Sequence, residues 1–281
     1  MVLGDVSNQL RCSESVAAEL VASSSDAIRR KINRKRLKDK CADQLPTCPE
    51  DFLNVPDEYA QINGQPFLQH AELVDGKPML VFFSQNGVSQ LNNSSVWASD
   101  GNFSFVPDQF AQLYVIFASK DEHVFPAVYA FLPSKSAHVY EKMFECVLSA
   151  VSTAPQKLVV DFERAVINTV ESQIEGIVVE GCLFHWKKAI FSHMQKIGLL
   201  RLFNQDENMQ SAMQLIYSLA YVPAEQIVDI FENRVKTQID EFCKQWGDEN
   251  ADLVKKLLLY VEKYWIGEKV SIVCFLLMEE V

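Results

Sequence analysis

Several widespread sequence signatures are missing from this chain. It has no glycine-rich nucleotide-binding loop, no G-x-S-x-G segment and no H-E-x-x-H segment. The motifs typical of P-loop NTPases, α/β-hydrolases and zincin metalloproteases are therefore absent. Internal repeats are absent too, which excludes a repeat architecture. Because hydrophobic residues make up 48% of the 281 positions, the chain can bury the core of one elaborated domain or two smaller ones.

The chain also has few features of secreted or membrane proteins. Its seven cysteines are scattered without a C-x-x-C pair, and no secretory leader is visible at Met1. The longest apolar run, residues 270–278, is about half as long as a membrane-spanning helix. We therefore expect free thiols and a soluble intracellular protein of the nucleus or cytoplasm, with no membrane partner.

Positive charge is scarce overall and gathers in one segment. The net charge is -11, yet residues 29–40 hold eight of the 26 basic residues and one acid, which leaves 18 basic and 36 acidic residues elsewhere. A thin apolar seam through Ile28 and Ile32 predicts a cationic helix. This helix could contact phosphates or direct the protein to the nucleus, or it could be a solvated surface helix. In the first case the DNA-contacting residues would be Arg29, Arg30, Lys31, Arg34, Lys35 and Arg36.

The order of predicted elements changes along the chain. Prolines punctuate residues 41–66, which predicts a linker or a strap lying on the body. Two apolar runs then predict a β-hairpin over residues 67–83, followed by a turn at 85–87. Further patterns predict strands at 96–100, 113–118, 124–132, 158–161 and 177–180, with helices at 136–151, 162–173 and 183–197. Beyond residue 198 the pattern is helical. For residues 270–277 three interpretations stay open: a strand, a buried helical turn or a disordered end.

The β-β-β-α-β-α-β order from residue 96 is that of a ribonuclease H-like domain, an α/β fold with a mixed sheet. We predict a basic segment and linker over 1–66, the ribonuclease H-like core over 67–198 and a helical insertion region over 199–281. In this topology the first and fourth strands lie side by side at the centre of the sheet. Asp100 and Asp161 end these two strands, so folding would bring them together across 61 residues of sequence.

Two neighbouring carboxylates repel one another unless a cation lies between them, they share a proton, or they turn apart. Mg²⁺ and Mn²⁺ prefer oxygen ligands, and two such ions about 3.5–4 Å apart can stabilise both oxygens of a displacement at phosphorus. Taken singly, Asp100 before Gly101 is typical of a turn and Asp161 is typical of a helix cap. The strand order is what predicts a metal site for phosphoryl transfer at Asp100 and Asp161.

Cys182 and His185 have the C-x-x-H spacing of half a zinc site. No second pair with matching spacing occurs, although His193 lies on roughly the same helix face. A packing role at the start of the helix remains open beside metal binding. Glu163, close to Asp161, could face the site or be a first-turn acid stabilised by the helix dipole. We treat the remaining histidines as ordinary.

Five segments together resemble the MULE domain of Mutator-like transposases, in the DDE/D superfamily, and look most like its animal versions. The resemblance spans roughly residues 50–266. It is carried by Trp97-Ala98-Ser99-Asp100-Gly101-Asn102-Phe103, Pro107-Asp108-Gln109-Phe110-Ala111-Gln112-Leu113-Tyr114, Asp161-Phe162-Glu163-Arg164-Ala165, Gly181-Cys182-Leu183-Phe184-His185-Trp186-Lys187 and Leu219-Ala220-Tyr221-Val222-Pro223.

This resemblance implies a ribonuclease H-like fold and metal-assisted DNA strand cleavage and transfer. It implies that Asp100 and Asp161 are the first two acids that bind Mg²⁺ or Mn²⁺, and that Cys182 and His185 are the C-x-x-H signature, where zinc is an alternative. The implied partner is DNA at transposon ends, and a homo-oligomer is left open. A helical insertion would precede a third acid, a glutamate.

The sequence departs from the family pattern at this third acid. Residues 260–267 match the approach to it, but residues 269–274 do not continue into the usual T-N-N-x-x-E segment. Glu268, Glu279 and Glu280 lie in the region without that motif, and the family's N-terminal zinc-bearing module is missing. The resemblance is therefore to a domain truncated before its third catalytic acid. The alternative to an active transposase core is an inactive domesticated or fragmentary relic that binds DNA or protein.

Overall fold

The computed structural model describes residues 46, 48–104, 106–121 and 123–266. The described residues from Phe52 onward form one compact unit. Several predicted features lie outside the described residues: the apolar run 270–278, the acids Glu268, Glu279 and Glu280, and the basic residues Arg29, Arg30, Lys31, Arg34, Lys35 and Arg36. The predicted boundaries 1–66, 67–198 and 199–281 stay predictions.

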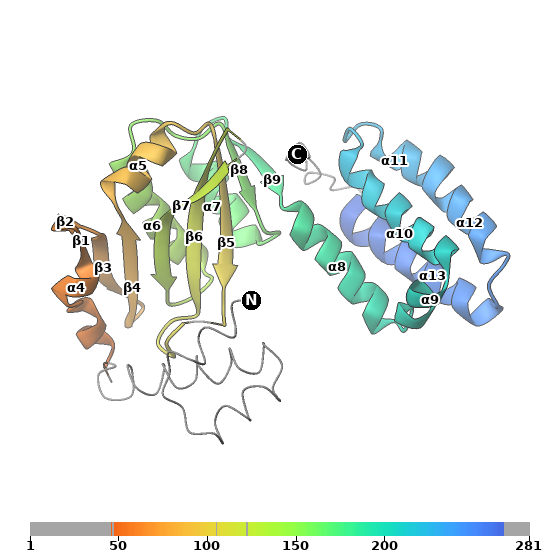
Figure 1. Ribbon diagram of the computed structural model, residues 1–281, viewed down its shortest axis with the longest axis horizontal. Helices are drawn as coiled ribbons and strands as arrows, with labels where there is room; N and C mark the ends of the chain where they lie inside the picture. Colours follow the sequence, from red (N-terminus) through yellow and green to blue (C-terminus); the bar gives the residue numbers. More distant parts are fainter. Residues whose placement is uncertain (1–45, 47, 105, 122, 267–281) are drawn as a thin grey trace, which may run out of the picture. The chain divides into compact units, whose positions relative to one another are not determined.

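A seven-stranded mixed sheet is the centre of the fold, with strand order β3-β4-β7-β6-β5-β8-β9 (Figure 1). Strand β5 pairs parallel with β8, and β8 pairs parallel with β9, whereas the other pairs are antiparallel. This mixed α/β arrangement is consistent with a ribonuclease H-like fold. The strands are β3 (Leu68–Val74), β4 (Lys77–Phe83), β5 (Val96–Asn102), β6 (Gln112–Lys120), β7 (His123–Leu132), β8 (Lys157–Val160) and β9 (Val178–Gly181).

The predicted hairpin over 67–83 is confirmed as β3 and β4, and it extends the sheet, because β4 pairs with β7. The predicted turn at 85–87 is wrong. These residues form the first turn of helix α5 (Gln85–Asn92). Ser84 begins this helix as its N-cap, since its hydroxyl accepts a hydrogen bond from the backbone N–H of Gly87 at 3.1 Å.

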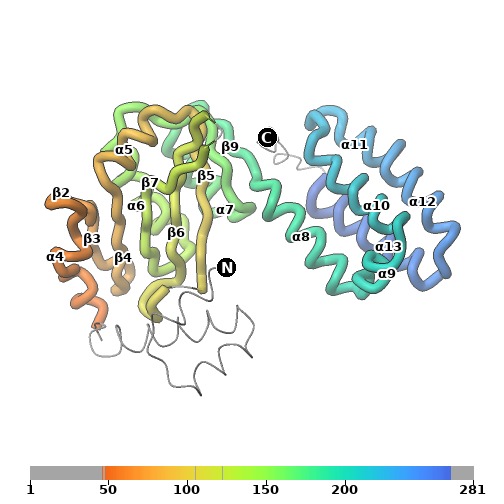
Figure 2. The backbone as a smooth tube through the Cα atoms, in the orientation of Figure 1, coloured from red at the N-terminus to blue at the C-terminus, as the bar shows by residue number. Residues whose placement is uncertain are grey.

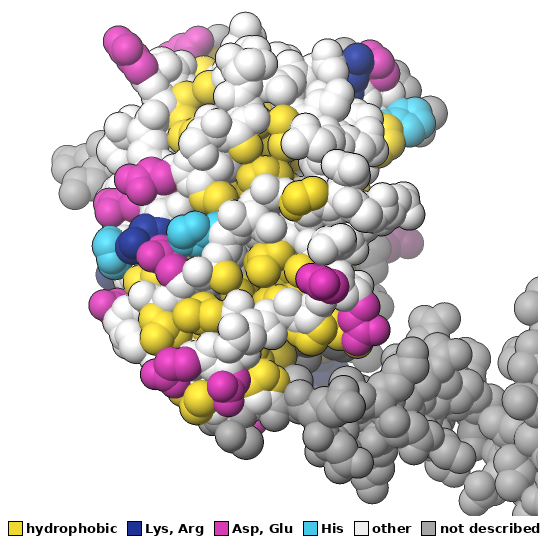
Figure 3. Space-filling model, turned by 90° about the vertical axis from the view of Figure 1, so that its left-hand side faces the viewer, with side chains coloured by type: hydrophobic (Ala, Val, Ile, Leu, Met, Phe, Trp, Pro, Cys, Tyr) yellow, Lys and Arg dark blue, Asp and Glu magenta, His cyan; other side chains and the backbone are white. Residues whose placement is uncertain are grey.

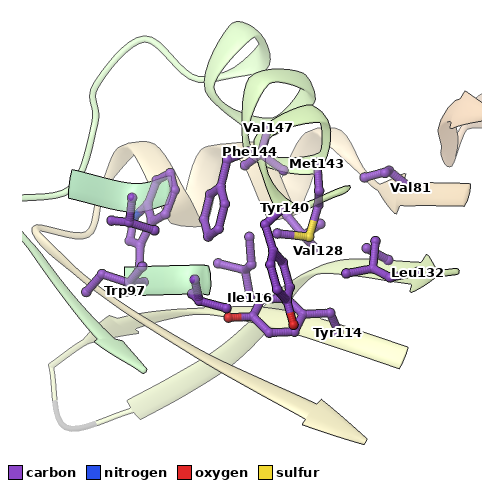
Figure 4. Packing of buried hydrophobic residues seen from close by; sticks show 14 of the residues in the cluster. Val81, Trp97, Tyr114, Ile116, Val128, Leu132, Tyr140, Met143, Phe144 and Val147 are labelled. Carbon is purple, nitrogen blue, oxygen red and sulfur yellow. The ribbon is translucent and has the colours of Figure 1, made fainter. Parts of the chain in front are cut away.

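Two helices, α6 (Ala137–Ala150) and α7 (Arg164–Gln173), pack against each other and against the sheet, and their apolar faces share one core with it. Figure 4 shows Tyr140, Met143 and Phe144 of α6 pointing toward the strand residues Trp97 and Tyr114. These five side chains are at most 1% exposed. Burying a large apolar side chain stabilises a fold by roughly 1.5–3 kcal/mol, so this layer fixes the sheet on which the candidate site is built.

The other face of the sheet carries a smaller aromatic cluster in which Phe82 and Phe131 contact each other, Phe110 contacts Phe131, and Phe52 contacts Phe110. Beside it lies a mainly apolar cleft of about 790 Å³, lined in part by Tyr59. Figure 3 shows hydrophobic side chains gathered on the side of the molecule that it presents. The predicted strap here contains short elements: η1 (Pro49–Leu53), α4 (Asp57–Ala60), β1 (Gln61–Ile62) and β2 (Gln65–Pro66).

After β9 the described residues, which end at 266, contain no further strand. Figures 1 and 2 trace the chain from β9 through α8 into a helical region with its own core, centred on residues such as Met213, Phe231 and Leu257. Among the described residues, no helix combines the length and apolar character needed to cross a membrane. The elements are α8 (Leu183–Lys196), α9 (Leu200–Gln205), α10 (Glu207–Ser218), η2 (Leu219–Tyr221), α11 (Ile227–Ile230), η3 (Phe231–Lys236), α12 (Thr237–Cys243), α13 (Asp248–Val261) and η4 (Glu262–Ile266).

Candidate functional site

The register between β5 and β8 sets the geometry of the candidate site. Val96 pairs with Lys157 and Ala98 pairs with Val159, an offset of 61 residues. The same offset, carried two residues past the last pair, brings Asp100 level with Asp161, which follows β8 directly. The prediction that the strands at 96–100 and 158–161 are neighbours is confirmed, because β5 lies next to β8 in the sheet. The predicted end of the first strand at Asp100 is two residues short, because β5 continues to Asn102, whereas β8 ends at Val160. Both aspartates therefore lie toward the carboxyl end of the parallel β5–β8 pair.

A close backbone approach beside this end of the pair depends on a glycine. A Cβ atom at Gly181, the last residue of β9, would overlap the ring of Phe162, the residue after Asp161. The backbone N–H of Cys182 donates to the carbonyl of Val160 at 2.8 Å, which holds the two strand ends together. The chain therefore enters α8 directly beside the end of β8, and this brings the C-x-x-H segment to the aspartates.

Asp161 is a partly buried carboxyl group whose neighbours do not fully offset the cost of burying its negative charge. Its Oδ1 atom is buried and has no hydrogen-bond partner among the described residues. Burial raises the pKa of Asp161, and the negative charge of Glu163 raises it further. A hydrogen bond from the backbone of Glu163 and the nearby charges of His185 and Lys135 lower this pKa only in part. A cation bound to the free oxygen would remove the cost of ionising this group.

Asp100 differs, because 54% of its side chain is exposed. The imidazole Nε2 atom of His185 lies 3.6 Å from its Oδ1 atom, too far for a hydrogen bond but within ion-pair range when the ring is protonated. The other ring nitrogen, Nδ1, is buried and has no hydrogen-bond partner among the described residues. Thus His185 of the C-x-x-H segment faces a predicted metal-binding acid. His193 lies elsewhere and stacks on Tyr260, with ring centroids 3.8 Å apart.

Glu163 is held by two side chains that sequence reasoning missed. The hydroxyl of Tyr140 donates to its Oε1 atom at 3.0 Å, and Lys135 donates to its Oε2 atom at 3.0 Å. Gln112 in turn donates to the hydroxyl of Tyr140 at 2.6 Å. Glu163 is the N-cap residue of α7 and makes no side-chain cap bond. The available signal was Tyr140 on the apolar face of a helix, since a buried tyrosine hydroxyl needs a partner.

The residues present fit a hard divalent cation better than zinc. Mg²⁺ is commonly held by one or two carboxylates, with water and substrate phosphate as the other ligands, and Asp100 with the unpaired oxygen of Asp161 can supply them. Zinc sites in proteins use three or four side chains. In the part of the chain that the structure describes, no three His, Cys, Asp or Glu side chains converge as a metal site, so Cys182 and His185 lack further zinc ligands there.

One comparison with known proteins covers the central part of this site. The family model of the MULE transposase domain matches residues 96–189, from the first residue of β5 into α8. This range includes Asp100, Asp161, Cys182 and His185, together with the contacts of Glu163 with Lys135 and Tyr140. A MULE transposase domain implies an ancestry in DNA transposition, with DNA and a divalent metal as the partners of the family. None of the curated proteins matches the chain.

Proposed function

We propose that the protein is a transposase-derived DNA-processing core that uses Asp100 and Asp161 to hold a divalent cation at a scissile phosphate. The observation that carries this proposal is the β5–β8 register, because its offset of 61 residues is also the separation of Asp100 and Asp161. The match to a MULE transposase domain over the same strands supports it independently. The reaction would be DNA strand cleavage with water as the nucleophile, followed by strand transfer with a 3′-hydroxyl.

Each residue of the site has a role that follows from its surroundings. A bound Mg²⁺ or Mn²⁺ would supply charge stabilisation at phosphorus and lower the pKa of a bound water. Asp161, whose ionisation is opposed by burial, would offer its unpaired oxygen, and the exposed Asp100 would complete the pair. Lys135, and His185 when its ring is protonated, would add positive charge near a phosphate bound at this cation. Glu163 would fix the start of α7 through its bond from Tyr140.

A second candidate function is an inactive module that keeps the fold and binds DNA or protein. The observation that favours it is that the described residues contain no third acid beside Asp100 and Asp161 in a metal-binding group. Glu268, Glu279 and Glu280, the acids near the expected position of the third one, lie outside the described residues. Loss of one metal-ligating acid would leave a second ion short of a ligand.

Nicking of supercoiled plasmid in Mg²⁺ or Mn²⁺ separates the two functions. We expect the wild type to nick, and we expect Asp100→Asn and Asp161→Asn each to lower the rate by more than about 100-fold. Loss of an outer-shell partner of a metal already costs about 10- to 100-fold, and a direct ligand should cost more. Asp75→Asn is the matched control, since Asp75 lies in the β3–β4 turn with a φ of 52° that asparagine also adopts. Wild-type protein that binds DNA but nicks with neither ion would establish the inactive module.

A further inference from the structure

An exposed phenylalanine with a lysine beside its ring lies next to the candidate site. Phe103 follows β5 and is 49% exposed, and Lys135 Nζ lies 4.1 Å from the centroid of its ring. The Phe103 ring reaches back over the glycine that follows Asp100. Lys135 also donates to Glu163, two residues after Asp161. This first pair therefore lies against Gly101, the residue after Asp100, and against Glu163, two residues after Asp161.

A second pair of the same kind comes from the start of α8. Phe184 is 66% exposed, and Lys188 Nζ, one helical turn later, lies 5.8 Å from its ring centroid. The same ring meets His185 edge to face, with centroids 5.4 Å apart and planes at 80°. His185 faces Asp100 at 3.6 Å. The candidate site is thus approached from two chain segments by an exposed aromatic face and a cation.

Single exposed aromatic side chains are ordinary on protein surfaces. Two phenylalanine–lysine pairs beside one carboxylate pair are a more specific arrangement. A nucleotide offers a base face for stacking and a phosphate for a cation, so each pair matches one nucleotide. Charge alone would hold a polyanion weakly, because the chain outside residues 29–40 has 18 basic and 36 acidic residues. Stacking supplies binding free energy that does not depend on net charge.

We propose that the pairs Phe103–Lys135 and Phe184–Lys188 bind unpaired nucleotides of a DNA strand beside Asp100 and Asp161. The identity of the polymer as DNA rests on the proposed function. The new element is the form of the substrate: bases inside an intact duplex hide their faces, so these side chains select strand ends or locally melted DNA. The base next to the scissile phosphate would stack on one phenylalanine while the adjacent lysine contacts the backbone.

Equilibrium binding of the full chain in EDTA tests this without cleavage. The probe is a duplex whose single-stranded 3′ overhang carries 2-aminopurine, and a blunt duplex of the same sequence is the comparison. We expect stacking to quench the probe. Phe103→Leu and Phe184→Leu should each weaken overhang binding by between about 5-fold and about 150-fold and reduce the quenching, with blunt-duplex affinity unchanged. Phe184→Trp should restore both signals.

The matched control is Phe125→Leu, because Phe125 on β7 is 39% exposed and stacks on His123 rather than on a lysine. Lys188→Gln should reduce the slope of log affinity against log salt for the overhang by about 0.7, the value for one phosphate contact on a single strand. Unchanged melting temperatures would show that the exposed positions leave the fold intact. Equal losses for Phe125→Leu, unaffected binding in both site variants, or no overhang binding by the wild type would overturn the inference.

The same assay keeps this inference separate from the proposed catalysis. Asp100→Asn and Asp161→Asn should retain overhang binding in EDTA, since the proposed stacking uses the two phenylalanines and not the acids. If quenching depends on the phenylalanines but the protein never nicks DNA, the proposed binding of unpaired nucleotides is supported and the catalytic function is rejected. If both phenylalanine variants nick and bind an overhang substrate as the wild type does, the proposed binding of unpaired nucleotides is rejected and the catalytic function is not.

Discussion

Two carboxylates on the same sheet have opposite surroundings. Glu72 on β3 lies 2.9 Å from Lys142 Nζ of α6 and 3.1 Å from His70 Nε2. Burial opposes its ionisation, but these two partners outweigh burial, and the pKa of Glu72 is lowered. For Asp161 burial is the largest effect and the nearby charges do not outweigh it, so its pKa is raised. The folded protein therefore favours the ionised form of Glu72 and disfavours the ionised form of Asp161.

This difference indicates which acid is structural and which is held ready for a ligand. A carboxylate that a fold uses for stability acquires cationic partners, as Glu72 does. Asp161 has positive groups near it, yet Lys135 bonds to Glu163 and His185 faces Asp100. The positive charge at this end of the sheet is thus directed at neighbours of Asp161, and its Oδ1 atom stays unpaired among the described residues. Perturbed, incompletely compensated acids of this kind are enriched at functional sites.

The largest test of this comparison is thermal melting during titration with Mg²⁺ or Mn²⁺. A cation that binds only the native state, at a concentration of about 100 times its dissociation constant, raises the free energy of unfolding by about 2.7 kcal/mol. We expect this gain for the wild type and for Glu72→Gln, whose change is at β3. We expect it to disappear in Asp161→Asn. A metal-dependent shift of equal size in Asp161→Asn would show that the cation binds elsewhere.

Tyr140→Phe should leave Glu163 Oε1 without its hydrogen-bond donor, while Lys135 still donates to Oε2. The change removes the donor to Glu163 Oε1 and also the acceptor of the Gln112 amide. Because Tyr140 is fully buried, we expect a loss of about 2 kcal/mol from the free energy of unfolding, measured by urea denaturation.

Tyr114→Phe is the matched control, since Tyr114 is also buried and its hydroxyl hydrogen-bonds to Ser99 Oγ, at 2.7 Å, rather than to a carboxylate. This variant should lose only about 1 kcal/mol. If the two variants lose equal stability, Glu163 does not depend on Tyr140, and the contrast between compensated and uncompensated acids is weaker than we infer.

Periodicity and strand order could predict the centre of this fold, and the reason is local. The runs that become β5 and β8 each alternate or are continuously apolar, and each leads to an acid, Asp100 or Asp161. A parallel pair needs a helical crossover, and the helical spacing of α6 supplied it. The position of both acids toward the carboxyl end of the β5–β8 pair follows from these local patterns once the topology is assumed.

The contacts that give the site its electrostatics could not be predicted in this way. Lys135 and Glu163 are 28 residues apart, and Tyr140 and Glu163 are 23 apart, with no periodic pattern that joins them. The pairing of β4 with β7 is equally non-local, which is why the hairpin's place in the sheet was missed. The error at α5 was local instead: Gly87 suggested a turn, whereas Ser84 three residues earlier was a helix cap.

Glu72→Gln tests the compensated side of the comparison. A carboxylate whose pKa is lowered in the native state adds stability above its unfolded pKa, 4.5, and this stability is lost as the pH falls through the native pKa. We therefore expect the variant to be less stable by about 1 kcal/mol at pH 6, as for a partly exposed ion pair. The difference between the two proteins should shrink below pH 4.5. A difference that stays constant down to pH 3 would mean that packing, not charge, is responsible.

Asp161→Asn in EDTA should have the smallest effect and the opposite sign. A carboxyl group whose native pKa is raised above its unfolded value, 3.8, binds protons more tightly when folded. Its favourable contribution is complete below pH 3.8 and is lost as the pH rises through the native pKa. The amide cannot ionise, so the variant should have a higher free energy of unfolding than the wild type at neutral pH. We expect this difference to be less than about 1 kcal/mol, because the amide also lacks a full set of hydrogen bonds. This advantage should vanish in acid. As the pH rises from 3 to 7, the melting temperature of Asp161→Asn should rise relative to the wild type, and that of Glu72→Gln should fall relative to the wild type. If both variants shift in the same direction, the fold does not distinguish the two acids.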